Sequence, residues 1–170
     1  MSNHSPMLPN GEKPQIEDIT ERWIQDALSR GEIVKIAAYG GSMRPWIRSG
    51  DCVFIKAVTL NQIRIGDVLY LPASTRLKSQ KALIHRVLWF NKNSLWTKGD
   101  SLLWFDQVHD LNTNSCVDAA IIGRVTHWER EGRYCFRIPR VVGLLSSLLY
   151  TLVCIFGVIR MYHFLKSKRM

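Results

Sequence analysis

The segment that decides the fold is GGSMRP at residues 40–45, which joins two β-branched runs at residues 32–39 and 52–58. The two glycines permit backbone angles that other residues avoid, and they keep neighbouring side chains away from the Ser42 hydroxyl. The proline ends the turn and restricts the residue before it. This pattern predicts two strands joined by a tight turn, with the Ser42 hydroxyl either exposed for chemistry or bonded to its own backbone.

Short runs rich in Val, Ile and aromatic residues continue along the chain, separated by Gly, Asp, Asn and Pro. These are strand and turn signals, and their close spacing is typical of a compact antiparallel β-domain. Residues 91–93 and Glu131-Gly132 are placed to form hairpin turns. The expected strands cover residues 32–39, 52–58, 68–71, 82–90, 94–97, 121–128 and 133–138, with a loop at 73–80.

The N-terminal part differs from this pattern. Residues 1–14 are polar and are predicted to form a flexible arm, not a secretory signal peptide. Apolar residues then recur at helical spacing before Gly31, which predicts an amphipathic helix that packs on the domain. These residues are Ile16, Ile19, Trp23, Ala27 and Leu28. The β-domain with this helix is expected to occupy residues 15–138.

Residues 139–170 are predicted to form an apolar helix with a basic tail. Val141–Ile159 contains no charged residue, and a helix needs about 20 apolar residues to cross a bilayer. Ser146, Ser147 and Thr151 dilute this stretch, so a buried or interface-lying helix is the alternative. A single membrane span is favoured because a domain of this size has nothing with which to cover a helix that is apolar all round. Basic residues flank both ends, so charge does not set the orientation.

The composition of the 170 residues indicates one globular domain, because 46% are hydrophobic and 22% are charged. The net charge of +9 suggests an anionic neighbour such as nucleic acid or a lipid surface. The cysteines form no Cys-x-x-Cys pair, so we expect no structural zinc site and no cofactor. Nucleic acid is not expected as a partner, because the tryptophans lie in apolar strand contexts typical of a core. These tryptophans are Trp89, Trp96, Trp104 and Trp128, and the cysteines are Cys52, Cys116, Cys135 and Cys154.

A second segment, LIHRV at residues 83–87, places His85 within an apolar run that is expected to be a strand. A serine hydroxyl is a poor nucleophile without a nearby base, and histidine is the usual base near neutral pH. A carboxylate that orients the imidazole completes such a site, and Asp100 and Asp106 follow downstream. Each residue also has a structural alternative: a strand position for His85, a turn for Asp100 and a solvated loop for Asp106.

Several short motifs occur in a fixed order along the chain. They are SMRP at 42–45, Gly50-Asp51, GDV at 66–68, HRV at 85–87, TKGD at 97–100 and IGRV at 122–125. This ordered set resembles the signal peptidase I superfamily, in particular the endoplasmic-reticulum-type branch in which histidine replaces the catalytic lysine. The resemblance covers roughly residues 34–125. It implies a coiled antiparallel β-domain and a membrane-associated serine endopeptidase that removes signal or leader peptides.

The resemblance also implies a role for each motif residue. Ser42 is the nucleophile, His85 the general base and Asp106 the catalytic aspartate, with Asp100 as a supporting carboxylate. The substrate is an extended peptide that adds as a strand beside the site, with small residues next to the cut. Met43 and nearby apolar side chains are expected to line a membrane-facing edge.

Two features depart from the family's pattern. Gly40 stands where the family has a serine that helps to stabilise the oxyanion, so the backbone N–H of Ser42 must carry that task. The apolar helix lies at the C-terminal end, whereas the family's anchor precedes the domain.

Two other functions stay open. One is a cytosolic peptidase that acts on a dedicated partner peptide, similar to the self-cleaving repressors. Those proteins use a lysine base, however, and here Lys78 and Lys81 are offset from His85. The other is a non-catalytic relative that only binds peptides, which the loss of the serine at Gly40 favours.

Overall fold

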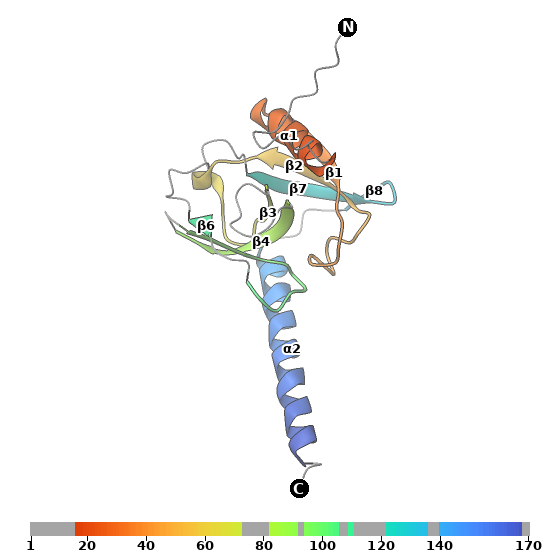
Figure 1. Ribbon diagram of the computed structural model, residues 1–170, viewed down its shortest axis with the longest axis vertical. Helices are drawn as coiled ribbons and strands as arrows, with labels where there is room; N and C mark the ends of the chain where they lie inside the picture. Colours follow the sequence, from red (N-terminus) through yellow and green to blue (C-terminus); the bar gives the residue numbers. More distant parts are fainter. Residues whose placement is uncertain are drawn as a thin grey trace, which may run out of the picture.

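A computed structural model describes residues 16–72, 82–91, 94–105, 109–110, 122–135 and 140–167. The protein is mainly β, with one antiparallel sheet lying between a helix near the N-terminus and a long helix at the C-terminus (Figure 1). The predicted arm at 1–14, the predicted loop at 73–80 and Asp106 lie outside the described residues.

The predicted strands are confirmed, with their ends shifted by a few residues. The sequence does not predict β6 or the single 3₁₀ turn at Leu60–Gln62, because elements this short leave no periodic pattern. The strands are β1 (Ile33–Ala37), β2 (Cys52–Ala57), β3 (Val68–Leu71), β4 (Leu83–Phe90), β5 (Ser94–Lys98), β6 (His109–Asp110), β7 (Gly123–Arg130) and β8 (Arg133–Cys135).

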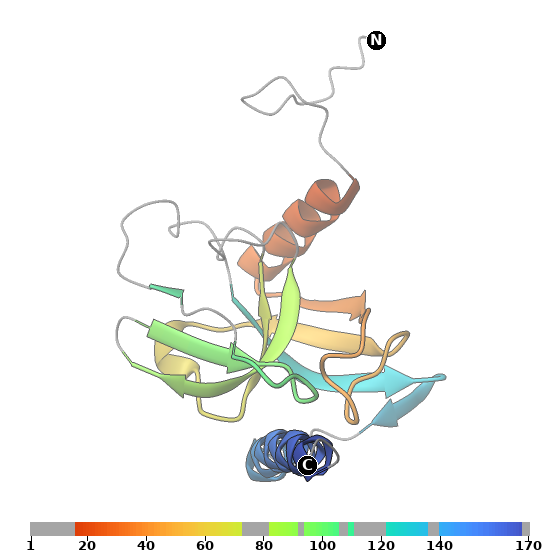
Figure 2. The same cartoon turned by 60° about the horizontal axis from the view of Figure 1, so that its bottom comes forward.

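Non-local pairing organises the sheet. The strand order is β1-β2-β7-β3-β4-β5-β6, with β8 paired to β7, and each of these pairings is antiparallel. β7 comes late in the sequence but lies between the early strands β2 and β3 (Figure 2). Register shifts at Phe54/Ile55 and Val87/Trp89 mark bulges, which bend a strand and increase its local twist. This is the antiparallel β architecture that the turn spacing predicts.

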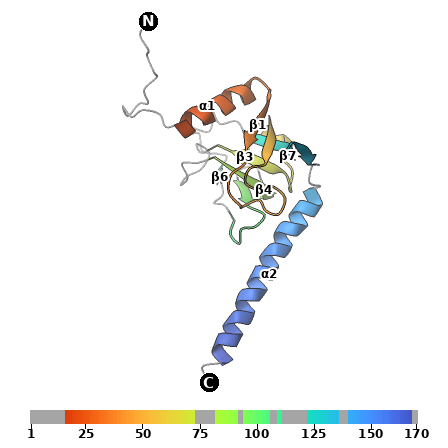
Figure 3. The same cartoon turned by 90° about the vertical axis from the view of Figure 1, so that its right-hand side faces the viewer.

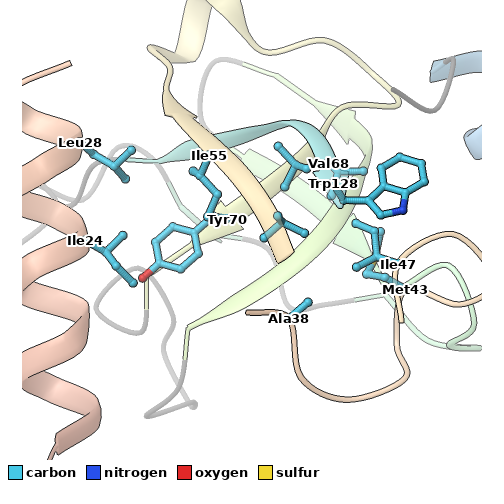
Figure 4. Close-up of a cluster of buried hydrophobic side chains, with 11 residues drawn as sticks. Ile24, Leu28, Ala38, Met43, Ile47, Ile55, Val68, Tyr70 and Trp128 are labelled. Atoms are coloured by element: carbon cyan, nitrogen blue, oxygen red, sulfur yellow. The ribbon is translucent and has the colours of Figure 1, made fainter. Parts of the chain in front are cut away.

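The side chains of the sheet form two clusters on its two faces, because successive residues of a strand point to opposite sides. On β3, Val68 and Tyr70 belong to the first cluster, whereas Leu69 and Leu71 belong to the second. The first cluster also takes in α1 and the turn after β1 (Figure 4).

The predicted N-terminal helix is present as α1 (Ile16–Ser29), but its buried face differs from the one expected. Ile24 and Leu28 pack into the first cluster one turn apart, whereas Trp23 is 75% exposed and Ile19 is also exposed. The helical spacing of the apolar residues fits two adjacent stripes equally well. The contact with Tyr70 and Ile55 selects the stripe that contains Ile24 and Leu28 (Figure 4).

The C-terminal apolar helix is also present, as α2 (Arg140–Ser167). Its first turns lie against the domain and the rest projects well beyond it (Figures 1 and 3). The segment Arg140–Arg160 has a mean hydropathy of 2.3 and is only 11% buried, so by length and composition it can cross a membrane. A helix in the core of a soluble protein passes the same test of composition but is mostly buried.

The sequence suggests that the four tryptophans belong to the core, but the structure places only some of them there. Trp128 is buried in the first cluster, but Trp89, Trp96 and Trp104 are exposed. Trp89 and Trp96 meet edge to face, with ring centroids 6.4 Å apart. The prediction of buried strand tryptophans is therefore wrong for three of the four, because strand periodicity does not say which face of a strand is covered. The positions of the tryptophans therefore do not speak against a nucleic-acid partner.

Candidate active site

Ser42 lies on the turn that follows β1. Gly40 has a φ of +87°, which glycine adopts without strain, and this reverses the chain after the strand. The turn then closes through bonds from the Arg44 amide to the Gly41 carbonyl (3.1 Å) and from the Ile47 amide to the Met43 carbonyl (3.0 Å). The Arg44–Pro45 peptide bond is cis. These features place Ser42 at the start of a compact turn at the edge of the domain.

The hydroxyl and the amide of Ser42 differ from its carbonyl in their hydrogen bonding. Within the described residues, neither its hydroxyl nor its amide N–H has a hydrogen-bond partner, and the residue is half-buried. A bond from the Ser42 hydroxyl to its own backbone, the structural alternative, is not among the hydrogen bonds of the described residues. A free hydroxyl and a free N–H on one residue provide a nucleophile and a donor for an oxyanion.

The carbonyl of Ser42, in contrast, is held firmly by the segment after β5. It accepts hydrogen bonds from the Ser101 amide (2.8 Å) and the Ser101 hydroxyl (3.0 Å), and the same hydroxyl bonds the Gly41 carbonyl (2.7 Å). A Cβ at Gly99 would lie 2.8 Å from the Ser42 carbonyl oxygen, so only glycine allows this approach. The segment Gly99–Ser101 thus fixes the position of Ser42.

The same segment holds β4 through a buried ion pair. Asp100 receives two hydrogen bonds from Arg86, from Nε to Oδ1 and from Nη2 to Oδ2, each 2.7 Å long. Both side chains are fully buried, and the Arg86 Nη1 group also bonds the Gly66 carbonyl at 2.8 Å. Asp100 is therefore occupied by Arg86. This agrees with a supporting role and leaves the orientation of His85 to another group.

His85 lies next to Arg86 in the middle of β4 and is only 6% exposed. It is opposite Leu69 in the β3–β4 register, so its side chain lies on the face of Leu69 and Val87, opposite to that of Arg86. β5 pairs with β4 only from Arg86 onward, so His85 stands just before the paired region.

Ser42 and His85 are linked indirectly. Ser101 bonds the Ser42 carbonyl, its sequence neighbour Asp100 bonds Arg86, and Arg86 directly follows His85 on β4. A direct hydrogen bond between Ser42 and His85 is not among the contacts of the described residues. Such bonds are often long before a substrate binds. Asp106 lies outside the described residues, so its predicted role stays a prediction.

The resemblance implies that Met43 lines a membrane-facing edge, and this prediction is wrong. It is 4% exposed and packs in the first cluster near Ala38, Ile47 and Trp128 (Figure 4). The compact turn at 41–47 directs the residue after Ser42 inward, so Met43 anchors the turn to the core.

Sequence reasoning missed Lys98 as a residue of this region. Lys98 is 1% exposed, and its ammonium group donates to the Gly99 carbonyl (3.2 Å) and to Ser147 of α2. Burial lowers the pKa of Lys98, and the charge of Asp100 opposes this shift. The strand register explains why Lys98 is found here. Lys98 lies opposite Arg86, and two buried charged side chains on one face of a sheet need partners; this register is visible only in the fold.

Asp51 and Asp67 each stabilise the turn that precedes a strand. Asp51 accepts a bond from the Arg48 amide (2.8 Å), and Asp67 accepts one from the Arg64 amide (3.0 Å). Each also pairs with an arginine that is distant in sequence: Arg130 bonds Asp51, and Arg140 bonds Asp67. The Arg130 guanidinium holds the pKa of Asp51 below its ordinary value, against the opposing effect of burial.

The described residues contain no group of three or more His, Cys, Asp or Glu side chains placed to hold a metal ion. No family model matches this sequence, and no curated protein and no solved structure matches it significantly. The geometry of the site and the order of its motifs are therefore the features that bear on function.

Proposed function

We propose that this chain is a membrane-anchored serine endopeptidase that cleaves a signal or leader peptide from a precursor protein. The observation that carries the proposal is the state of Ser42. Its hydroxyl and amide have no hydrogen-bond partner among the described residues, while its carbonyl is fixed by Ser101 in the segment that also holds the strand of His85. The resemblance of the motifs to the signal peptidase I superfamily supports the same reading.

In this mechanism the Ser42 hydroxyl attacks the scissile carbonyl and His85 accepts its proton. The carbonyl oxygen becomes an oxyanion, which the Ser42 N–H stabilises. His85 then gives the proton to the leaving amine, and water releases the acyl group by the same steps in reverse. Asp106 is the candidate for orienting His85.

The sheet offers edges for an extended substrate. β1 is an edge strand and ends at Ala37, five residues before Ser42. The start of β4, at Leu83 and Ile84, precedes the part that pairs with β5. A peptide that adds as a strand at such an edge gains main-chain hydrogen bonds whatever its sequence, while nearby pockets select its side chains.

The second candidate is a peptide-binding protein without catalysis. It is favoured by Gly40, because a φ of +87° there strains any residue with a side chain, including the serine that would assist an oxyanion. An open apolar groove between α1 and β1, with a volume of about 620 Å³, offers a surface for such binding.

A cleavage assay separates the two candidates. The full chain in detergent micelles is incubated with membrane-protein or secretory precursors that carry a signal peptide, and products are identified by mass spectrometry. We expect Ser42→Ala and His85→Ala to abolish cleavage, because each removes a reacting group, and Ser42→Ala to leave the melting temperature almost unchanged. The matched controls are Ser49→Ala, an exposed serine near the same turn, and His127→Gln, a histidine that stacks on Phe54.

Both controls are expected to cleave at the wild-type rate. Full cleavage by Ser42→Ala or His85→Ala contradicts the assignment of these residues. Binding of the precursor without any cleavage by the wild-type chain favours the second candidate.

A further inference from the structure

Helix α2 meets the domain through small and polar residues. A Cβ at Gly143 would lie 2.5 Å from the Arg86 guanidinium, so glycine is needed for the helix to come this close. Ser147 is fully buried, whereas Leu145, Leu148 and Leu149 around it are exposed. A helix that served only as a tether would need no such face. The face formed by Gly143, Ser146 and Ser147 is called the docking face below.

The first bond of the docking face reaches the turn of Ser42. The Trp46 indole Nε1 donates to the Ser146 hydroxyl at 2.8 Å, and that hydroxyl donates to the Gly143 carbonyl at 2.9 Å. The Trp46 amide in turn bonds the Met43 carbonyl at 3.2 Å, within the turn that carries Ser42. α2 therefore holds the nucleophile's turn from one side.

The second bond of the docking face reaches the segment that grips the Ser42 carbonyl. The Lys98 ammonium donates to the Ser147 hydroxyl at 3.0 Å and to the Ser147 carbonyl at 3.3 Å. Lys98 leads directly into Gly99–Ser101. A buried ammonium group without partners is strongly disfavoured, so these bonds restrict where Lys98 can lie.

We propose that docking of α2 positions Ser42, so that the helix is a working part of the active site. Ser146 and Ser147 are positioning residues, which act through Trp46 and Lys98 on the two segments that seat the nucleophile. The part of this inference that concerns catalysis depends on the proposed function. It adds that the peptidase is competent only while α2 is docked against the sheet.

The test compares serine variants of the full chain in detergent micelles, with the precursor cleavage assay. We expect Ser147→Ala to lower kcat by roughly 10- to 100-fold while KM changes by less than about twofold, because displacing a reacting group by about 1 Å is enough for such a loss. Ser147→Thr keeps the hydroxyl and is expected to recover most of the rate. Leu149→Ala, at an exposed position two residues further along, is the matched control and is expected to leave kcat unchanged.

Hydrogen exchange reports on the same bonds without any substrate. In Ser147→Ala we expect faster exchange at the Ser101 amide, which bonds the Ser42 carbonyl, and no change in β2. If the wild-type chain cleaves nothing, the proposed function fails and this measurement alone decides whether the helix positions Ser42. In that case unchanged exchange at Ser101 overturns the inference.

If the wild-type chain does cleave, a Ser147→Ala variant with wild-type kcat overturns the inference, whatever its exchange. Should Ser147→Ala not fold, Ser146→Ala is the variant to test, because it removes the bond from Trp46, together with the hydroxyl's own bond to the Gly143 carbonyl, and keeps the bonds of Lys98 to Ser147. An unchanged kcat in Ser146→Ala then overturns the inference in the same way.

Discussion

Asp100 illustrates how a single residue obtains its role from its partner. As a carboxylate after glycine it is either a turn residue or part of a catalytic site, and the sequence does not decide between them. Its two hydrogen bonds to the buried Arg86 guanidinium occupy both of its oxygens. It therefore organises the site by holding β4 to the segment beside Ser42.

The Asp100–Arg86 pair predicts a large loss of stability when one partner is neutralised. Asp100→Asn leaves a buried guanidinium without its counter-charge, which costs about 3–5 kcal/mol of unfolding free energy. Urea unfolding in detergent micelles, followed by circular dichroism, measures this loss. Ser42→Ala is the reference and is expected to unfold within about 0.5 kcal/mol of the wild type. Equal stability of the Asp100→Asn and Ser42→Ala variants would contradict the structural role.

Among the elements, the strands follow directly from local sequence and their partners do not. β-branched runs between turn residues predict where each strand lies, because strand propensity and turn chemistry act over a few residues. The pairing of β7 with both β2 and β3 is decided by packing between distant segments. The buried stripe of α1 is likewise chosen by the Tyr70 and Ile55 side chains that it meets.

The turn before β2 is tied to β7 by the Asp51–Arg130 pair, and this tie predicts a pH dependence. The pKa of Asp51 is lower in the folded protein than its ordinary value of 3.8, chiefly because of the hydrogen bonds from Arg130. The stabilisation is therefore complete above about pH 5 and is lost as the pH falls through the folded pKa.

Asp51→Asn is expected to lower the unfolding free energy at pH 7 by about 1–3 kcal/mol, the value of hydrogen bonds to a charged group. Urea midpoints of the variant and the wild type, measured between pH 7 and pH 3, are expected to converge as the pH falls. A difference that stays constant over this range would show that the charge of Asp51 contributes nothing.

For the whole molecule, the main feature is the projection of α2 beyond the sheet (Figure 3). Many of its apolar residues are exposed, whereas soluble monomers rarely expose contiguous apolar patches of more than a few hundred Å². By length and composition the helix can cross a bilayer, whose hydrocarbon core would cover these residues on all sides.

Membrane anchoring through α2 is tested by substitution at two exposed positions of the helix, Leu152 and Phe156. Leu152→Arg with Phe156→Arg costs about 2.5–3.5 kcal/mol of insertion free energy per arginine near the centre of a span. We expect the double variant to move to the soluble fraction after alkaline carbonate extraction, while the wild type stays in the membrane pellet. Leu60→Arg, at an exposed position on the domain, is the control. A wild-type chain that is fully extracted would exclude the anchor.

The sequence by itself determined the β class, the strand positions, the two helices and the candidate residues Ser42, His85, Asp100 and Asp106. These depend on periodicity, turn residues and motif order, which are local properties of the chain. Only the tertiary structure decided that Met43 is buried, that Asp100 belongs to Arg86, and that Lys98 joins α2 to the segment beside Ser42. The physical reason is that buried polar groups must find partners, and those partners come from segments that are distant in sequence and meet only on folding.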